Sequence, residues 1–352
     1  MPYELFEGAD GLDAVRDSWE RLESHSPAGV FQTYEFCRLW FDTVGSHIGA
    51  RPLIVTLSEN GEPHGVFPAC VVPYGPVRML TWLSGPLVVG SGDILWSGRT
   101  DVTLDAFMRE ALARLRRRAG VAALYLTNVR ADARAFPYLA ENALPYKRGA
   151  SPYIEIRGEF DEYFAALSRD VRRSVGRRWR RLAETGEVRF EVLGPGDPPC
   201  GEAAKLLVDF SRDRHGVRAE RDNALGGHYA ALRVAQACGA AHGRLARLTL
   251  DGRTIALQLF YLYRDRADLA IFAFDPEFSA FSPGKLLLRS MVEECFRQGL
   301  NVLDLGEGSD SYKYEWTSSG TSLTTFTSHD LLGKALCAVG NRQRRSRDET
   351  SS

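Results

Sequence analysis

The chain has 352 residues, of which 44% are hydrophobic and 25% are charged, as in a soluble globular protein large enough for two domains. Its formal net charge of −1 gives no overall attraction to nucleic acids or anionic membranes. No apolar run approaches the roughly 18 residues of a membrane span, and the first residues lack the pattern of a signal peptide. We therefore expect a cytoplasmic protein with no membrane span.

Cysteine and histidine spacing argues against several kinds of site. The six cysteines are scattered without a CxxC pair, which is typical of free thiols in a reducing compartment. The seven histidines show no HxxxH or HxH spacing, so we predict no metal site. Neither a GxSxG elbow nor a GxxxxGK[ST] phosphate loop occurs.

Alternating strand and helix patterns predict an α/β (α+β) domain over residues 1–150. The expected elements are a strand at 3–6, helices at 10–22 and 31–45, a hairpin of strands at 51–57 and 65–72, an extended stretch at 78–89, a helix at 104–119, a strand at 121–126 and a helix at 136–142.

Residues 151–335 are predicted to form a second domain of the same class, and residues 336–352 a disordered basic tail. The expected elements are a strand at 153–156, a helix at 161–182, a strand at 188–193, helices at 203–214 and 229–237, an antiparallel meander at 244–250, 255–263 and 269–274, a helix at 283–298, and strands at 301–305 and 322–328. The polar segment 215–223 is expected to be a lid or substrate edge.

The predicted helix at 161–182 carries a basic face. At about 100° per residue, its arginines fall within an arc of roughly 140° opposite the apolar residues. They are Arg169, Arg172, Arg173, Arg177 and Arg180. Two interpretations stay open, a solvated surface or a site for the phosphates of a nucleotide, a cofactor or RNA. Under the second, Arg173 is a candidate substrate-binding residue.

The segment FSPGK is predicted to open the helix at 283–298 as an anion-binding turn. Pro283 suits the first helical turn, Ser282 is an acceptable N-cap, and Gly284 exposes the backbone beside Lys285. Free amides at a helix N-terminus and one lysine could hold a phosphate. The alternative is a helix start that binds nothing.

Acids, phenols and a lysine follow the predicted strand at 301–305. The group consists of Asp304, Glu307, Asp310, Tyr312, Lys313 and Tyr314. The alternative to a functional cluster is a solvated turn with ordinary salt bridges.

Several runs resemble one protein family. They are FQTYEFCRLW at 31–40, LSRDVRRSVGRRWRRLAETG at 167–186, and the stretch from IALQLFYLY at 255–263 through FAFDPEFSAFSPGKLLLRSMVEECFRQGLNVLDLGEGSDSYKYEW at 272–316. Together they resemble the CelD/BcsL-type acetyltransferases, relatives of the FemABX peptidyltransferases with the GCN5-related N-acetyltransferase fold. The resemblance covers about residues 3–330 and implies tandem acetyltransferase-like domains, each a mixed, mostly antiparallel sheet flanked by helices.

The resemblance implies transfer of an acyl group from acyl-CoA, with acetyl-CoA the first candidate, to an amine of a sugar, amino acid or small metabolite in a biosynthetic pathway. The wider superfamily binds coenzyme A through a Q/R-x-x-G-x-G/A loop, and this chain departs from it with FSPGKL at 281–286. FemABX relatives use aminoacyl-tRNA, so an aminoacyl-tRNA-dependent transferase is the alternative and tRNA a conditional partner. A non-catalytic binding protein is a third hypothesis.

Attack of an amine on a thioester requires loss of a proton from the amine and protonation of the departing thiolate. Glu307 and Asp304 are the candidate bases, with Glu307 ahead because it lies past the strand. Tyr312 and Tyr314 are candidate acids, and Lys313 is a candidate substrate contact. Salt bridging of the carboxylates and packing of the tyrosines are the alternatives.

Further candidates precede the helix at 283–298. By position in the parent fold, Phe272, Ala273 and Phe274 form the splayed strand that offers amides to the acyl carbonyl, next to the cofactor. Asp275 is expected either to hold the acceptor or to cap a turn, and Gln258 is a candidate substrate-binding residue.

Overall fold

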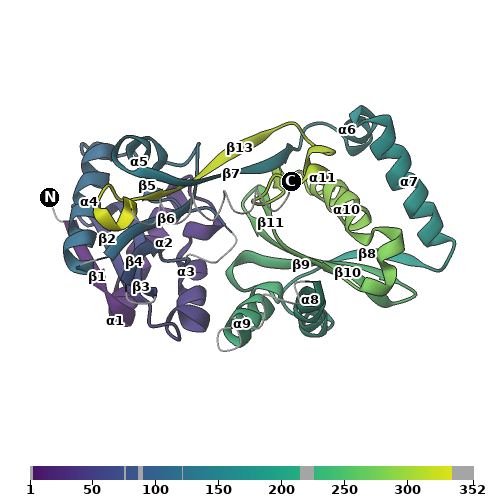
Figure 1. The fold of residues 1–352 in the computed structure, drawn as a ribbon, viewed down its shortest axis with the longest axis horizontal. Helices are drawn as coiled ribbons and strands as arrows, with labels where there is room; N and C mark the ends of the chain where they lie inside the picture. Colours follow the sequence, from purple (N-terminus) through teal and green to yellow (C-terminus); the bar gives the residue numbers. More distant parts are fainter. Residues whose placement is uncertain (1–2, 75–76, 86–89, 121, 215–225, 335–352) are drawn as a thin grey trace. The chain divides into compact units, whose positions relative to one another are not determined.

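The structure is a computed structural model that describes residues 3–74, 77–85, 90–120, 122–214 and 226–334. The chain divides into two compact units, one of residues 1–150 with 321–352 and one of residues 151–320. Each unit is a mixed, mostly antiparallel sheet flanked by helices (Figure 1), which confirms the expected α/β class. The predicted lid at 215–223 and tail at 336–352 lie outside the described residues.

The first unit has the strand order β1-β2-β3-β4-β6-β13, with β5 paired to β3. Its strands are β1 (Tyr3–Glu7), β2 (Arg51–Glu59), β3 (Glu62–Tyr74), β4 (Val77–Trp82), β5 (Leu95–Trp96), β6 (Ala122–Arg130) and β13 (Gly320–Thr327). Its helices are α1 (Gly8–Ala14), α2 (Arg16–His25), η1 (Val30–Gln32), α3 (Tyr34–Trp40), the π-helical η2 (Phe41–Gly45), α4 (Leu104–Ala119) and α5 (Phe136–Asn142).

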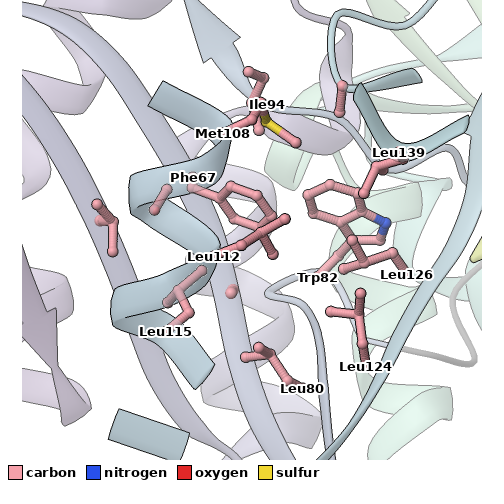
Figure 2. Close-up of a cluster of buried hydrophobic side chains, with 14 of the residues drawn as sticks. Phe67, Leu80, Trp82, Ile94, Met108, Leu112, Leu115, Leu124, Leu126 and Leu139 are labelled. Atoms are coloured by element: carbon pink, nitrogen blue, oxygen red, sulfur yellow. The ribbon is translucent and has the colours of Figure 1, made fainter. Parts of the chain in front are cut away.

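The core of the first unit forms where α4 packs on the sheet (Figure 2). The Thr103 hydroxyl caps α4 by accepting from the amide of Ala106. Met108 and Leu112 of the helix then face Phe67 and Trp82, whose stacked rings have centroids 5.2 Å apart. The apolar side of α4 therefore packs on aromatic residues of two neighbouring strands, β3 and β4.

The last strand changes the expected domain limits. β13 pairs antiparallel with β6, with Leu323 opposite Arg130 and Thr327 opposite Tyr125. Residues from Thr321 onward therefore group with the first unit, whereas the sequence assigned residues 151–335 to the second domain. Pairing between strands about 200 residues apart leaves no local signal, which is why the pattern of the sequence missed it.

Three helices expected from the sequence are interrupted. The helix at 10–22 is divided into α1 and α2 at Val15, and the segment 31–45 contains η1, α3 and η2. The helix at 161–182 is divided into α6 (Phe160–Ala166) and α7 (Arg169–Ala183). Leu167 is extended there, and the Ser168 hydroxyl accepts from the amide of Val171 to start α7. A local serine cap therefore interrupts an otherwise continuous apolar pattern.

The second unit has the strand order β7-β12-β11-β10-β9-β8. Its strands are β7 (Leu144–Glu155), of which residues 151–155 belong to this unit, β8 (Val188–Leu193), β9 (Gly243–Leu250), β10 (Arg253–Tyr263), β11 (Arg266–Phe274) and β12 (Val302–Asp304). Besides α6 and α7, its helices are α8 (Cys200–Arg214), α9 (Gly226–Ala237), η4 (Ala240–His242), η5 (Pro276–Phe281), α10 (Pro283–Arg297) and α11 (Ser311–Tyr314). The predicted meander is therefore present as β9 to β11.

Helices cover both faces of this sheet (Figure 1). Leu257 and Ala273 pack with α8, whereas Ala256 and Phe260 belong to the cluster that includes α7 and α10. Because strand side chains alternate between faces, Gln258 shares the α10 face.

None of the helices in the described ranges combines the length and apolarity needed to cross a bilayer.

Candidate active site

Two neighbouring strands of the second unit diverge at the centre of the candidate site. β11 and β12 pair in parallel only from Arg266 to Asp268 on β11, and the last pair joins Asp268 to Asp304. β11 continues to Phe274 beside β10, while the chain leaving β12 turns at Gly306, where φ is 76°. A Cβ atom at Gly306 would lie 2.9 Å from the Leu269 carbonyl oxygen. Glycine is therefore required both for the turn and for the close approach.

A cavity of about 510 Å³ adjoins this divergence, a size typical of small-molecule sites. Its lining residues come from β10, β11, η5, α10, α11 and the segment after β12. They are Gln258, Leu269, Phe272, Phe274, Ser279, Ser282, Pro283, Gly284, Lys285, Leu287, Leu288, Met291, Leu305 and Tyr312. The structure thus brings the predicted anion-binding turn, the predicted splayed strand and one predicted phenol to a single cavity.

The start of α10 is more open than a capped helix. Ser282 occupies the N-cap position in the left-handed conformation, with φ 53°, and its side chain caps no amide, so the expected cap is wrong. The Ser282 hydroxyl instead accepts a hydrogen bond from Arg178 Nε at 3.0 Å. Among the described residues, the amide of Gly284 consequently has no acceptor. An exposed amide at a helix N-terminus can bind an anion.

Gly284 also lets an aromatic ring approach the helix. A Cβ atom at this position would lie 2.7 Å from Cζ of Phe272. Phe272 in turn stacks on Phe274, with ring centroids 5.7 Å apart. The glycine therefore sets the width of the cavity between α10 and β11.

Lys285 carries its charge in an ion pair. Its Nζ donates to Glu315 Oε2 at 2.6 Å, and the two side chains are 28% and 34% exposed. The lysine lines the cavity as predicted, but the carboxylate of Glu315 balances its charge. Glu315 was not singled out from the sequence, where it is one of many acids.

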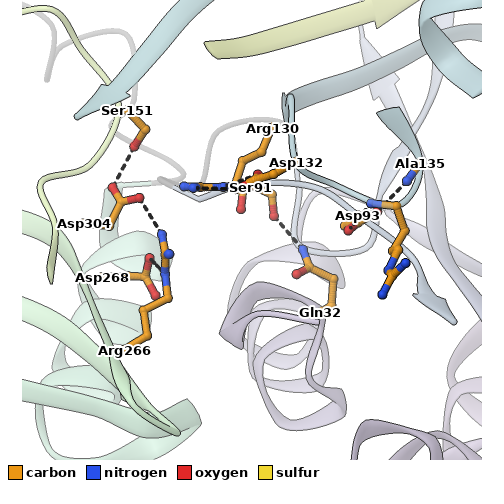
Figure 3. Close-up of polar contacts among 11 residues, drawn as sticks. Gln32, Ser91, Asp93, Arg130, Asp132, Ala135, Ser151, Arg266, Asp268 and Asp304 are labelled. Atoms are coloured by element: carbon orange, nitrogen blue, oxygen red, sulfur yellow. Dashed lines mark hydrogen bonds and ion pairs between the residues drawn. The ribbon is translucent and has the colours of Figure 1, made fainter. Parts of the chain in front are cut away.

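Asp304 lies outside the cavity lining and is 3% exposed. Its carboxylate accepts a hydrogen bond from Ser151 Oγ at 2.6 Å and pairs with Arg266 Nη2 at 2.5 Å (Figure 3). It also accepts a hydrogen bond from the Gly306 amide at 2.8 Å. Arg266 also binds Asp268 at 2.8 Å. These contacts anchor the end of β12 where the strands separate.

Lys313 is buried and holds the turn that follows β12. Its Nζ donates to the carbonyl oxygens of Gly306 at 2.9 Å and Glu307 at 2.8 Å. Burial lowers the pKa of Lys313, and the nearby carboxylates of Asp310, Asp304 and Glu307 oppose that shift. These contacts give Lys313 a part in shaping the turn, whereas the sequence suggested a substrate contact.

The two tyrosines of α11 differ in position. Both are exposed, Tyr312 to 42% and Tyr314 to 48%, but only Tyr312 lines the cavity. Residues two apart on a helix point about 200° apart. Tyr312 is therefore the phenol that a bound molecule would meet.

Gln258 is the buried polar group of the cavity wall. It is 7% exposed, and its Nε2 donates to the Leu259 carbonyl oxygen at 2.7 Å. Among the described residues, nothing donates to its amide oxygen. This oxygen is not one of the fully buried atoms without a partner, so in the cavity wall it can accept a hydrogen bond from water or from a bound molecule.

The other candidates lie away from the cavity. Asp275 is buried, pairs with Arg253 at 2.6 Å and caps η5 by accepting from the Glu277 amide at 3.0 Å, which matches the capping alternative. Ala273 faces α8 on the opposite side of the sheet. Arg173 is exposed on α7. Within the described ranges, no group of His, Cys, Asp and Glu is arranged to hold a metal ion.

Comparisons with known proteins agree with this geometry. Residues 169–314 match a family described as an acetyltransferase (GNAT) domain. A search of curated proteins finds no match. The fold is similar to FemX (TM-score 0.60, 13% identity, 89% of this chain and 95% of that chain covered).

Two other solved structures are also similar. One is the C-terminal domain of a proposed lysylphosphatidylglycerol synthetase from Agrobacterium fabrum (TM-score 0.58, 12% identity, 93% and 95% covered). The other is a tandem GNAT protein from the clavulanic acid biosynthesis pathway (TM-score 0.52, 12% identity, 93% and 98% covered). The chain therefore has a tandem GNAT-like fold, and residues 169–314 in its second unit match an acetyltransferase (GNAT) domain, which supports an acyltransferase.

Proposed function

We propose that the protein is an N-acyltransferase that moves an acyl group from acyl-CoA to an amine of a sugar, amino acid or small metabolite in a biosynthetic pathway. Acetyl-CoA is the first donor to test, and the CelD/BcsL-type acetyltransferases are the proposed subfamily. One observation carries the proposal: a single cavity joins the uncapped start of α10 to Gln258 and Tyr312.

The lining suggests how the donor would lie. The open amide of Gly284 suits a phosphate of the coenzyme. From there, Phe272, Leu287 and Met291 provide an apolar wall for the thioester arm. The wall runs about two helical turns along α10, or roughly 10 Å at 1.5 Å per residue. The reactive carbonyl would then lie deeper than the phosphates, close to the diverging strands.

The polar residues can then serve the reaction. The amine attacks the thioester carbon, the bond to sulfur breaks, and an amide and a free thiol result. Tyr312 is the proposed donor of the proton to the departing thiolate, because it is the phenol that lines the cavity. Glu307 is the proposed base for the amine, since it follows the lining residue Leu305 by two positions. Gln258 is proposed to hold the acyl group or the amine through its amide.

Donor binding is tested by thermal unfolding with acyl-CoAs of two to ten carbons. A ligand present at 100 times its dissociation constant should stabilise the protein by about 2.7 kcal/mol, or roughly 5–11 °C for a domain of this size. No rise in Tm with any acyl-CoA would contradict the proposed donor.

The proton donor is tested by following release of the coenzyme thiol in the presence of an amine. Tyr312→Phe should lower kcat by about 10²- to 10⁴-fold, with a small effect on donor affinity. Tyr314→Phe is the matched control, because the same hydroxyl is removed two residues away outside the cavity. Equal rates in the two variants would show that Tyr312 does not donate the proton.

An aminoacyl-tRNA-dependent transferase of the FemABX type is the second candidate. Arg169, Arg173 and Arg177 are exposed on one side of α7, and none has an ion-pair partner among the described residues. Such a row suits a phosphate backbone, and binding should then fall steeply with salt. Absence of tRNA binding at low salt, or binding unchanged by Arg173→Gln, would exclude this candidate.

A further inference from the structure

Lys285, the cation expected beside the start of α10, already forms an ion pair within the protein. Lys285 pairs with Glu315 at 2.6 Å, so its charge is largely balanced before any ligand arrives. A carrier with phosphates brings several negative charges to this turn. Another cation within reach of Ser282 and Gly284 would be needed to offset them.

Arg178 of α7 lies at that position. Its Nε donates to Ser282 Oγ at 3.0 Å, and its Nη1 donates to the Ser174 hydroxyl and, at 3.3 Å, to the Ser174 carbonyl oxygen. The side chain is half-buried, and no carboxylate pairs with it in the part of the chain that the structure describes. Its Nη2 donates to none of the described residues. The guanidinium is therefore fixed by two serines and retains free N–H groups.

The place of Arg178 on α7 is unusual for an arginine. At about 100° per residue, it falls in the same arc as Val171, Val175 and Leu182, which are all buried. α7 contacts both α10 and η5 through this side. One turn further on, Arg181 lies 5.2 Å above the ring of Phe281, next to Ser282. Arg178 therefore lies on the packed side of α7 and contacts a serine of the cavity lining, which solubility alone does not explain.

We propose that Arg178 binds the phosphates of the acyl carrier, so that the ligand at this end of the cavity is a phosphorylated thioester carrier. The inference rests on the proposed function. With Nε on Ser282, the remaining N–H groups can pair with phosphate oxygens, which a planar guanidinium does well. The amide of Gly284 would bind the same group. Arg178 would thereby supply, at the FSPGKL turn, the positive charge that Lys285 does not supply because it is paired with Glu315.

The test compares an acyl-CoA with the matching acyl-pantetheine, which carries the same thioester arm and lacks the phosphates and the adenosine of the coenzyme. Dissociation constants for an acyl-CoA and for the matching acyl-pantetheine are measured by calorimetry with the wild-type protein, Arg178→Gln and Arg189→Gln. The control removes an exposed arginine of β8 that is paired with Glu187. Arg178→Gln should weaken acyl-CoA binding roughly 10- to 100-fold, as for loss of a hydrogen bond to a charged group. It should leave acyl-pantetheine binding unchanged, and the control should change neither.

Each other outcome overturns a distinct statement. Equal losses for both thioesters would show that Arg178 only holds the Ser282 turn, and no loss for either would show that it does not contact the ligand. Wild-type protein that binds neither thioester would instead refute the proposed donor. If Arg178→Gln fails to fold, Arg178→Lys keeps the charge without the fork. It should weaken acyl-CoA alone by a smaller factor, and an equal loss for both ligands would again overturn the assignment.

Discussion

The structure gives Asp304 an anchoring role that mutation can separate from catalysis. Replacing Asp304 with alanine removes the acceptor of Ser151 and of the Gly306 amide and leaves Arg266 without one of its two carboxylates. Loss of one partner from a buried ion pair costs about 3–5 kcal/mol. We expect the lower end, about 3 kcal/mol, because Arg266 keeps Asp268 and its side chain is 27% exposed.

Calorimetric unfolding is the assay for Asp304→Ala. A loss of about 3 kcal/mol corresponds to a fall in Tm of roughly 6–12 °C for a domain of 150–250 residues. Asp304→Asn keeps one oxygen as an acceptor and should fall about half as far. Asp161→Asn, at an exposed carboxylate of α6 in the same unit, is the control and should stay near the wild type. A stable Asp304→Ala protein without acyl transfer would refute this reasoning and make Asp304 a catalytic group.

Three further outcomes are expected. Gly284→Val should block the cavity, because its Cβ would meet Phe272 at 2.7 Å. The variant should lose acyl-CoA binding and about 1–3 kcal/mol of stability, and retained binding would contradict the cavity assignment. Lys313→Met should release the Gly306 and Glu307 carbonyls and cost about 1–3 kcal/mol, which urea unfolding would measure and an unchanged midpoint would exclude. Burial raises the pKa of Asp93 to about 6, so between about pH 4 and 6 the native state holds a proton that the unfolded chain has released. Stability should therefore fall as the pH rises through this range. In thermal unfolding Asp93→Asn should flatten this pH dependence, and an unchanged pH dependence would contradict the assignment.

Much of the second unit could be predicted because its signals are local. The tight turns of the meander and the proline and glycine flanking α10 act over a few residues, and Gly299, with φ 66°, ends that helix as the sequence indicates. The split into α6 and α7 was missed because one serine cap outweighs a continuous apolar pattern. The pairing of β13 with β6 was missed because it depends on contacts distant in the sequence.

The sequence predicted where the site residues lie along the chain better than it predicted what each of them does. The turn at Gly284 and the phenol of Tyr312 do line one cavity. Composition near a strand end cannot tell which carboxylate is buried, so the sequence ranked Glu307 ahead of Asp304 only by its position past the strand. Arg178 carried a signal that was overlooked, an arginine on the apolar arc of α7. The partner of Lys285, Glu315, carried none, because an ion pair depends on side-chain geometry.

Under the proposed function the cavity beside α10 binds an acyl-CoA, and calorimetric titration of the wild type and a cavity-filling variant tests that binding. Leu288 lines the cavity and is 7% exposed, so Leu288→Trp should fill the space from within. We expect one acyl-CoA bound per wild-type chain, and none bound by Leu288→Trp while its thermal unfolding remains cooperative. Equal affinity in the two proteins, or no binding by the wild type, would contradict it.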